Sequence, residues 1–387
     1  MALSLPPLAL YIHIPWCVRK CPYCDFNSHL APRGLPEKEY IRALMADLEQ
    51  DLPDVWGRPI VSIFFGGGTP SFFSPDAIAE IIENVAARLT LRPNLEITLE
   101  TNPGTIEHGR FAGYRRAGVN RISLGVQSFD DEALQRIGRI HDTAQTERAI
   151  KEAQDAGLDN LNVDLMYALP QQTITAALAD VDRAIRFQPA HISHYQLTLE
   201  PNTPFAASPP TLPDDDSAWD MQEQCLAKFA AAGYQQYEVS AYAQAQRRCV
   251  HNENYWRYGD YLGIGAGAHA KITDLNNQSI HRSAKIKHPR SYLEHAASAS
   301  RLASLEIIPD EQRPFEFMLN ALRLIEGFNL LDFSARTGIE LQCIQPQINQ
   351  ALDRGWIEQK DDRVRATELG QRFLNNVIEL FLPESSS

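Results

Sequence analysis

Short apolar runs rich in β-branched residues recur through the first 240 residues, and helical patterns separate most of them. Each run is short enough to be a strand buried on both faces, which is typical of parallel sheets. The predicted strands are Leu8–Ile14, Ile60–Phe65, Leu95–Leu99, Arg121–Val126, Leu161–Leu165 and His191–Leu197. Regular alternation of strand and helix predicts parallel strands joined by right-handed crossovers.

The helices between these runs have recognisable ends. Ser74 and Pro75 form an N-cap and a first helical residue, and glycines at 118, 157 and 233 stand where a helix ends in a left-handed residue. Six strand–helix units predict an α/β fold, a partial (β/α)6 barrel of the TIM type. Gln236–Ser240 is a candidate seventh strand, and a doubly wound open sheet is the competing architecture.

Polar residues at the ends of the predicted strands favour the barrel. Glycines 66–68 follow the second strand, Glu100 ends the third, Gln127 ends the fourth and Asp164 lies near the end of the fifth. A parallel α/β barrel assembles its active site at the carboxyl ends of many strands. An open sheet would concentrate these residues at one switch point.

The chain changes character after the predicted barrel. We expect a barrel over residues 1–240, an irregular connecting segment that covers the site over 241–310, and a mainly helical, winged-helix-like domain over 311–387. Winged helices often bind DNA, but this region contains 8 basic and 12 acidic residues. A structural or docking role is therefore favoured, without nucleic acid.

The composition supports a folded protein that does not coat nucleic acid. The 387 residues include 36 Lys+Arg and 49 Asp+Glu, so the formal net charge is −13. Affinity for nucleic acid comes from neutralising phosphates with basic side chains. The sequence has no apolar stretch long enough to span a bilayer, and residues 1–10 lack the basic start of a secretory signal. We expect a cytoplasmic protein.

Three of the six cysteines lie within eight residues, as Cys17-x3-Cys21-x2-Cys24. Three thiolates in one loop can hold three irons of a four-iron cluster and leave the fourth iron without a protein ligand. A zinc site completed by His13, Asp25 or His29 is the alternative, although the spacing differs from paired zinc knuckles.

The other three cysteines are scattered. Cys225 and Cys343 lie in helical patterns and are predicted to be core thiols.

The motif Tyr11-Ile-His-Ile-Pro-Trp-Cys17-x3-Cys21-Pro-Tyr-Cys24-Asp-Phe26, together with the run Gly66–Pro70, resembles the radical S-adenosylmethionine (SAM) superfamily. The similar branch contains oxygen-independent coproporphyrinogen dehydrogenases and heme chaperones, and the resemblance covers nearly the whole chain. It implies a [4Fe–4S] cluster on Cys17, Cys21 and Cys24 whose open iron binds SAM.

The same resemblance implies the residues of the SAM site. Glu100 and Asp164 suit the cationic amine or sulfonium and the ribose hydroxyls, and Arg139 suits a carboxylate. Glycines let the backbone approach the methionyl group closely, and the segment Gly263–His269 is implied to fold over the pocket. The residues that would line the site are Tyr11, Tyr23, Gly68, Thr69, Pro70, Glu100, Gln127, Arg139 and Asp164.

The segment His251-Asn-Glu-Asn-Tyr255 matches a pattern associated with the heme chaperones of this branch. A histidine nitrogen can ligate heme iron, and a tyrosine can hydrogen-bond a propionate. An ordinary loop histidine is the alternative, and Cys249 is a further candidate.

Two departures separate the chain from the dehydrogenase. Phe26 stands where that enzyme carries a further cysteine, and only ten residues precede Tyr11. We therefore expect a heme chaperone with heme-accepting membrane cytochromes as partners, membrane association during delivery, and a homodimer as one oligomeric state. A coproporphyrinogen III oxidase-like enzyme and an electron-transfer iron–sulfur protein are the alternatives.

Overall fold

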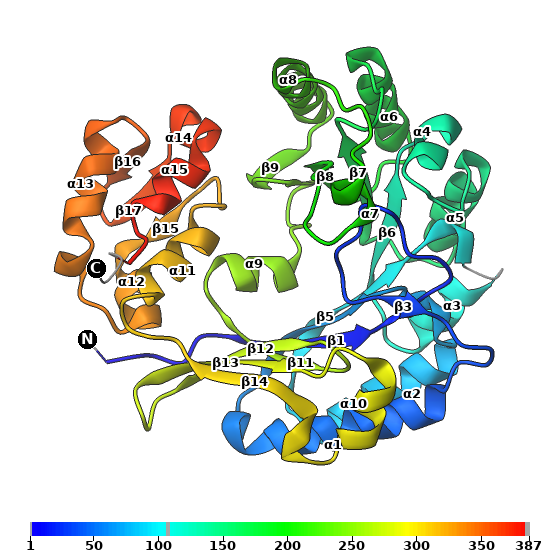
Figure 1. Cartoon of the computed structure of the whole chain (residues 1–387), viewed down its shortest axis with the longest axis horizontal. Helices are drawn as coiled ribbons and strands as arrows, with labels where there is room; N and C mark the ends of the chain where they lie inside the picture. The colour runs from blue at the N-terminus through cyan, green and yellow to red at the C-terminus, as the bar shows by residue number, and fades with distance from the viewer. Residues whose placement is uncertain (1, 106–108, 384–387) are drawn as a thin grey trace.

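A twelve-stranded sheet organises the protein (Figure 1). The structure is a computed structural model that describes residues 2–105 and 109–383. Six adjacent strands run parallel: β1 (Leu8–Ile14), β4 (Ile60–Gly67), β5 (Leu91–Thr101), β6 (Arg121–Gln127), β7 (Leu161–Tyr167) and β8 (His191–Gln196). These are the six predicted strands, and the α/β partial barrel is confirmed.

Helices cover the outer face of this curved sheet. They are α1 (Glu37–Val55), α2 (Pro75–Ala86), α3 (Arg110–Arg116), α4 (Asp131–Arg136), α5 (Thr143–Asp155), α6 (Ile174–Arg186) and α8 (Asp215–Ala231). The Ser74 side chain caps α2 by accepting from Ala77 N, and glycines 118, 157 and 233 have positive φ as predicted.

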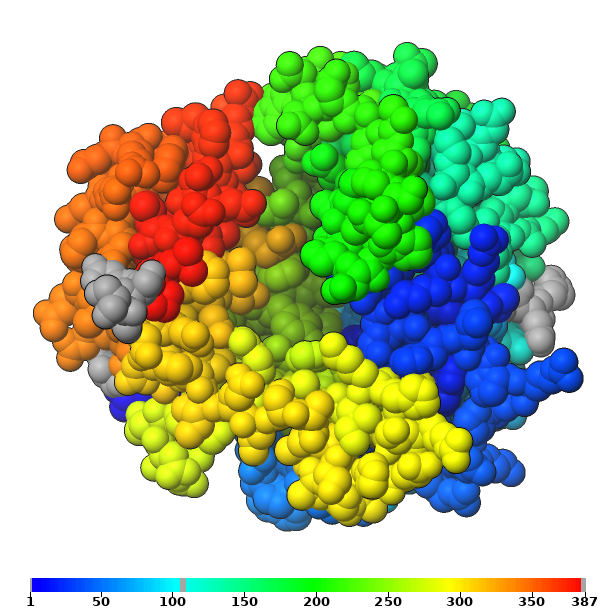
Figure 2. Space-filling view, in the orientation of Figure 1, coloured from blue at the N-terminus to red at the C-terminus, as the bar shows by residue number. Residues whose placement is uncertain are grey.

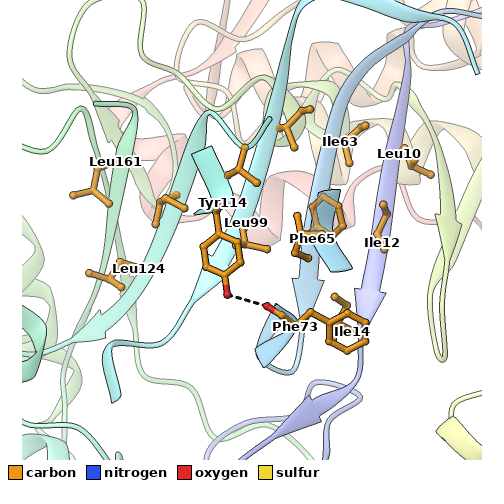
Figure 3. Close-up of a cluster of buried hydrophobic side chains, with 14 of the residues drawn as sticks. Leu10, Ile12, Ile14, Ile63, Phe65, Phe73, Leu99, Tyr114, Leu124 and Leu161 are labelled. Carbon is orange, nitrogen blue, oxygen red and sulfur yellow. Dashed lines mark hydrogen bonds between the residues drawn. The ribbon is translucent and has the colours of Figure 1, made fainter. Parts of the chain in front are cut away.

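The main core lies between the sheet and these helices (Figure 3). Leu10, Ile12, Ile63 and Phe65 on β1 and β4 are completely buried, together with Leu99 on β5. Because side chains alternate along a strand, the residues between them face the inside of the barrel. Burial of each such side chain stabilises the fold by roughly 1.5–3 kcal/mol.

The predicted seventh strand has a different role. β9 (Gln235–Glu238) pairs antiparallel with β10 (Ala241–Ala243), and β10 pairs antiparallel with β8. Gln236–Ser240 is therefore part of an antiparallel edge and does not continue the parallel barrel.

The segment 241–310, expected to be irregular, is largely regular. It forms α9 (Val250–Trp256), β11 (Asp260–Ile264), β12 (His269–Asp274), β13 (Ser279–Lys285), α10 (Pro289–His295) and β14 (Leu302–Ile307). β11 pairs parallel with β1, and the next three strands extend the sheet antiparallel. Their buried polar residues hide the strand pattern: Lys285 is fully buried between Asp47 and Asp51 of α1.

Gly263–Gly267 also lies in this sheet extension. The run belongs to β11 and the turn after it, and a Cβ at Gly265 would lie 2.4 Å from the His13 carbonyl oxygen. The glycines therefore permit close packing against β1.

The C-terminal unit has its own apolar core, which includes Phe317, Phe333, Ile348 and Val364. It contains α11 (Arg313–Ala321), β15 (Phe328–Asn329), α12 (Leu330–Thr337), α13 (Gln345–Asp353), β16 (Ile357–Lys360), β17 (Arg363–Ala366), α14 (Glu368–Arg372) and α15 (Leu374–Glu379). The predicted two-stranded wing is β16–β17, and β15 adds a third strand.

The two helical cysteines differ in burial. Cys225 on α8 is buried as predicted, but Cys343 is exposed, so the prediction of a core thiol there is wrong. Cys343 lies in a short 3-10 turn before α13, on a side away from the apolar core. Within the ranges that the structure describes, no helix is both long enough and apolar enough to cross a membrane.

Candidate functional site

The inner face of the barrel is accessible to solvent along one level of the sheet. Tyr11 is the only partly exposed residue of β1, and Asp164 is the only one of β7. Partly exposed inward positions recur at Phe64, Glu100, Gly125 and Tyr195. Figure 2 shows a hollow between the C-terminal unit and the barrel on the viewed face. The sheet therefore encloses an accessible lumen.

The cysteine loop lies at the carboxyl end of β1. Cys17 belongs to β2 (Trp16–Cys17), which pairs with β3 (His29–Leu30), and a turn joins Cys24 N to the Cys21 oxygen at 3.2 Å. All three cysteines are partly exposed free thiols. Burial raises the pKa of Cys17 and Cys24.

The His13 side chain holds the cysteine loop in place through a hydrogen bond. Its Nε2 lies 2.8 Å from the Asn27 carbonyl oxygen, and its Nδ1 lies 3.0 Å from the Tyr11 hydroxyl. Burial lowers the pKa of His13 to about 4, so the ring is neutral near pH 7. A carbonyl oxygen only accepts, so Nε2 carries the proton and Nδ1 accepts from Tyr11. Both nitrogens are occupied, and His13 cannot complete a zinc site.

The glycine run after β4 lies directly against the cysteine loop. Gly68 N donates to the Ile14 oxygen at 2.8 Å. A Cβ at Gly67, whose φ is +117°, would lie 2.6 Å from the His13 ring, and one at Gly68 would lie 2.6 Å from the Trp16 oxygen. The run therefore positions the cysteine loop, which is a reason for the glycines besides access for a ligand.

Two carboxyl groups face the lumen beside this loop. Glu100 accepts a hydrogen bond from Gly67 N at 3.2 Å. Burial and the nearby Asp164 raise the pKa of Glu100 to about 8, and burial raises the pKa of Asp164. A cation bound between them would favour their ionised forms. This arrangement suits the positive groups of SAM.

Arg139 and Thr69 contact the cysteines themselves. Arg139 Nη1 lies 3.6 Å from Cys21 Sγ, its Nη2 donates to the Gly125 oxygen at 2.6 Å, and Thr69 Oγ1 lies 3.5 Å from Cys17 Sγ. A guanidinium and a hydroxyl at these positions stabilise negative charge on sulfur.

The remaining predicted SAM residues lie at the same end of the barrel. Gln127 ends β6 with φ +70° and accepts from the Tyr195 hydroxyl at 2.7 Å. Tyr23 lies beside Cys21, and Pro70 begins the 3-10 turn after the glycine run. Positive φ at a buried glutamine is uncommon and is often found at functional sites. Tyr195 was not predicted from the sequence.

These residues fit an iron–sulfur cluster better than a single metal ion. In the described part of the chain, no three His, Cys, Asp or Glu side chains gather closely enough to hold one ion. A [4Fe–4S] cluster binds its cysteines through different irons, so the sulfurs surround a larger group. Three free thiols in one loop, with Arg139 beside them, match that donor set.

The segment that contains His251 and Tyr255 lies elsewhere, near the amino ends of the strands. α9 packs on the inner face of the sheet, against β4. Glu96 on β5 holds the first turn of α9 in place. The Glu96 carboxylate accepts hydrogen bonds from Val250 N and His251 N, both at 3.1 Å.

His251 is 2% exposed, and its Nδ1 lies 2.9 Å from Ser62 Oγ. Its Nε2 is buried without a hydrogen-bond partner among the described residues. Burial lowers the pKa of His251 to about 3, so the ring is neutral. In the tautomer whose Nδ1–H donates to Ser62 Oγ, the Nε2 lone pair is free to ligate a metal. This unpartnered atom fits an iron ligand.

Ser62, Phe64 and Glu96 were also missed in the sequence. Each alternates with a buried apolar residue on a predicted strand, and this period-two pattern could have assigned them to the inner face. Cys249, the other heme candidate, has its thiol 3.6 Å from Glu96 Oε1, and burial raises its pKa to about 12. It is a poor source of thiolate.

Comparisons with known proteins agree with this geometry. Residues 11–184 match the model of the radical SAM superfamily, and residues 308–373 match the HemN C-terminal domain. The heme chaperone HemW of Escherichia coli (strain K12) is 49% identical over 98% of this chain and 100% of its own length. The chain belongs to the radical SAM superfamily and, within it, to the HemW family.

Two further proteins share less sequence identity with this chain. The heme chaperone HemW of Bacillus subtilis (strain 168) is 31% identical over 97% of this chain and 99% of its own length. The solved coproporphyrinogen III oxidase HemN of E. coli aligns with a TM-score of 0.82 at 20% identity, covering 97% of this chain and 90% of that one. That likeness shows a shared fold.

Proposed function

We propose that this protein is a heme chaperone. It binds a [4Fe–4S] cluster, SAM and heme, and it transfers heme to acceptor proteins such as membrane cytochromes. The observation that carries the proposal is His251, a neutral imidazole inside the barrel whose Nε2 has no partner among the described residues. The full-length similarity to HemW proteins supports it.

The cofactors divide between the two ends of the lumen. At the carboxyl end, Cys17, Cys21 and Cys24 hold the cluster, which supplies an iron for SAM and, when reduced, an electron. Glu100 and Asp164 bind the positive groups of SAM, Arg139 holds negative charge near the cluster, and Tyr11, Tyr23, Gly68, Thr69, Pro70 and Gln127 complete the wall.

At the amino end, His251 ligates heme iron and Tyr255 contacts the porphyrin. Because His251 is almost completely buried, heme reaches Nε2 only when a neighbouring ring moves. Tyr255 packs edge-on to His251 at 5.1 Å between ring centroids and is partly exposed, so it is one such neighbour.

Phe26 supports a carrier over a porphyrinogen enzyme. Its side chain is 60% exposed on the cysteine loop, where it offers neither a thiol nor a polar group to a substrate. The likeness to coproporphyrinogen III oxidase is one of fold, and function depends on the site.

The larger setting follows from the same proposal. The protein works in the cytoplasm and meets the membrane during delivery, the unit over residues 311–387 docks partners, and a homodimer is compatible with this arrangement. We retain residues 1–240, 241–310 and 311–387 as the three functional parts.

Heme titration followed by absorbance tests the proposal. The reconstituted protein should bind heme tightly and release it to an added apo-cytochrome. His251→Ala should weaken binding, whereas His295→Ala on the surface should not. Failure of the wild-type protein to bind heme would overturn the proposed function.

A further inference from the structure

A row of aromatic rings runs along the inner face of the sheet. We call Tyr11, Phe64, His251, Tyr255 and Tyr261 the aromatic row. Centroid distances are 6.3 Å from Tyr11 to Phe64, 4.8 Å from Phe64 to His251, 5.1 Å from His251 to Tyr255 and 4.5 Å from Tyr255 to Tyr261. The rings come from β1, β4, α9 and β11, which are distant in the sequence.

The aromatic row is not ordinary core packing. Apart from His251, each of its rings is partly exposed, although its neighbours on β1 and β4 include fully buried side chains. Aromatic rings that remain accessible inside a concave face are typical of ligand sites, because their flat surfaces stack against a planar ligand.

A cation lies at the end of the aromatic row. Tyr261 pairs with Lys271 across β11 and β12, and Lys271 pairs with Arg282 across β12 and β13. Directly paired residues share a face of the sheet, so Arg282 stands in line with Tyr261. The Arg282 side chain is 42% exposed, and its Nη2 lies 2.6 Å from Glu316 Oε2 on α11.

Lys271, which lies between Tyr261 and Arg282 in the strand register, already has partners for its charge. Lys271 Nζ lies 3.1 Å from Asp260 Oδ1 and 4.1 Å from the centre of the Tyr258 ring, and its side chain is 4% exposed. Arg282 is therefore the cation of this pair that an incoming ligand can reach.

We propose that the aromatic row and Arg282 form the porphyrin subsite of the chaperone. The macrocycle stacks on the accessible rings of Phe64, Tyr255 and Tyr261 beside His251, while Tyr11, at the far end of the row, remains part of the SAM wall. A porphyrin carboxylate exchanges with Glu316 as the partner of Arg282. Because the chain carries a formal charge of −13, an acidic ligand needs a local cation. This inference rests on the proposed function and adds Phe64, Tyr261 and Arg282 to its site.

The test compares heme with heme dimethyl ester, which lacks the free carboxylates. Wild-type protein and Arg282→Gln are titrated with both ligands and followed by absorbance. A guanidinium–carboxylate pair predicts that wild-type protein binds the free acid about tenfold more tightly than the ester. Arg282→Gln should lose this preference while its affinity for the ester stays the same.

Matched variants separate ligand contact from structure. Arg290→Gln removes a surface arginine whose one ion pair among the described residues is with Glu294 on its own helix, and it should keep the preference. Glu316→Gln releases Arg282 and should strengthen binding of the free acid selectively. Tyr261→Leu should weaken both ligands equally, because it removes stacking and no charge.

The outcomes are distinguishable. Wild-type protein that binds no heme overturns the proposed function. Wild-type protein that binds heme and its ester equally, or an Arg282→Gln protein that keeps the preference, overturns this inference alone. Thermal unfolding of each variant identifies a folding defect, and the ratio of the two affinities within one variant is unaffected by a loss of folded protein.

Discussion

Two glutamates on one strand show how the two ends of the lumen differ. Glu96 and Glu100 are four residues apart on β5, so they share its inner face and lie about 13 Å apart along the strand. Glu96 accepts from Val250 N, His251 N and the Cys249 thiol. Among the described contacts, Glu100 accepts only from Gly67 N.

The comparison shows that hydrogen bonding decides what a buried carboxylate can do. Three donors commit Glu96 to holding α9 in place. Glu100 keeps its capacity for a positive ligand, and burial together with the nearby Asp164 raises its pKa. The carboxyl end of the lumen is therefore suited to a cation, and the amino end to a neutral imidazole and a flat ligand.

The largest expected effect is loss of the iron–sulfur cluster in a variant that still binds heme. Cys17→Ser should abolish stable iron and sulfide incorporation, because a three-cysteine site loses an iron ligand. Cys343→Ser should incorporate iron normally, since that thiol is exposed and lies in the C-terminal unit. Iron analysis and visible absorbance measure both. Heme binding by Cys17→Ser should persist, and its loss would contradict the division into two ends.

The second effect is on heme alone. His251→Ala should weaken heme binding about a hundredfold, because the iron loses the imidazole ligand whose Nε2 has no hydrogen-bond partner among the described residues. SAM binding, measured by equilibrium dialysis, should stay at the wild-type level. A parallel loss of SAM affinity would show that the two ends act as one site.

The third effect is on SAM alone. Glu100→Gln should weaken SAM binding about tenfold at pH 8.5. In wild-type protein the binding should strengthen as pH rises toward about 8, because the sulfonium prefers the ionised carboxylate. Glu100→Gln should flatten this dependence. A wild-type affinity that does not change with pH would contradict the raised pKa of Glu100.

The smallest expected effect is on thermal stability. Substitution of Glu100 and of Glu96 by glutamine should change the Tm in opposite directions. Glu100 keeps its proton to about pH 8 when folded, whereas an unfolded glutamate loses it near pH 4.3. The folded state therefore binds more protons in this window, and stability falls as pH rises through it. At pH 8, Glu100→Gln should raise the Tm of the cofactor-free protein by a few degrees.

Glu96→Gln should lower that Tm, because α9 loses a charged acceptor for three donors. Thermal unfolding at pH 5 and pH 8 measures both variants. At pH 5 the gain from Glu100→Gln should be several times smaller, because pH 5 lies only just above the pKa of an unfolded glutamate, where the loss of stability begins. If both variants change the Tm in the same direction at pH 8, the difference proposed between Glu96 and Glu100 is contradicted.

The sequence was sufficient for the barrel and the cysteine loop. Strands buried on both faces are continuous apolar runs, and Cys17, Cys21 and Cys24 lie close together along the chain. Their detection needs no knowledge of distant contacts.

The sheet extension and the aromatic row needed the structure. β11 and β13 carry buried charges such as Asp260 and Lys285, whose partners Arg58 and Asp47 are about 200 residues away. Arg282 reaches Tyr261 only through the register of three strands. Such long-range pairs leave no periodic pattern, which is why residues 241–310 looked irregular.

One measurement tests the central claim most directly. The reconstituted protein is incubated without oxygen with dithionite, SAM and coproporphyrinogen III, and the same preparation is titrated with heme. We expect tight, saturable heme binding and no vinyl product. Formation of vinyl product without heme binding would contradict a heme chaperone and identify a porphyrinogen enzyme.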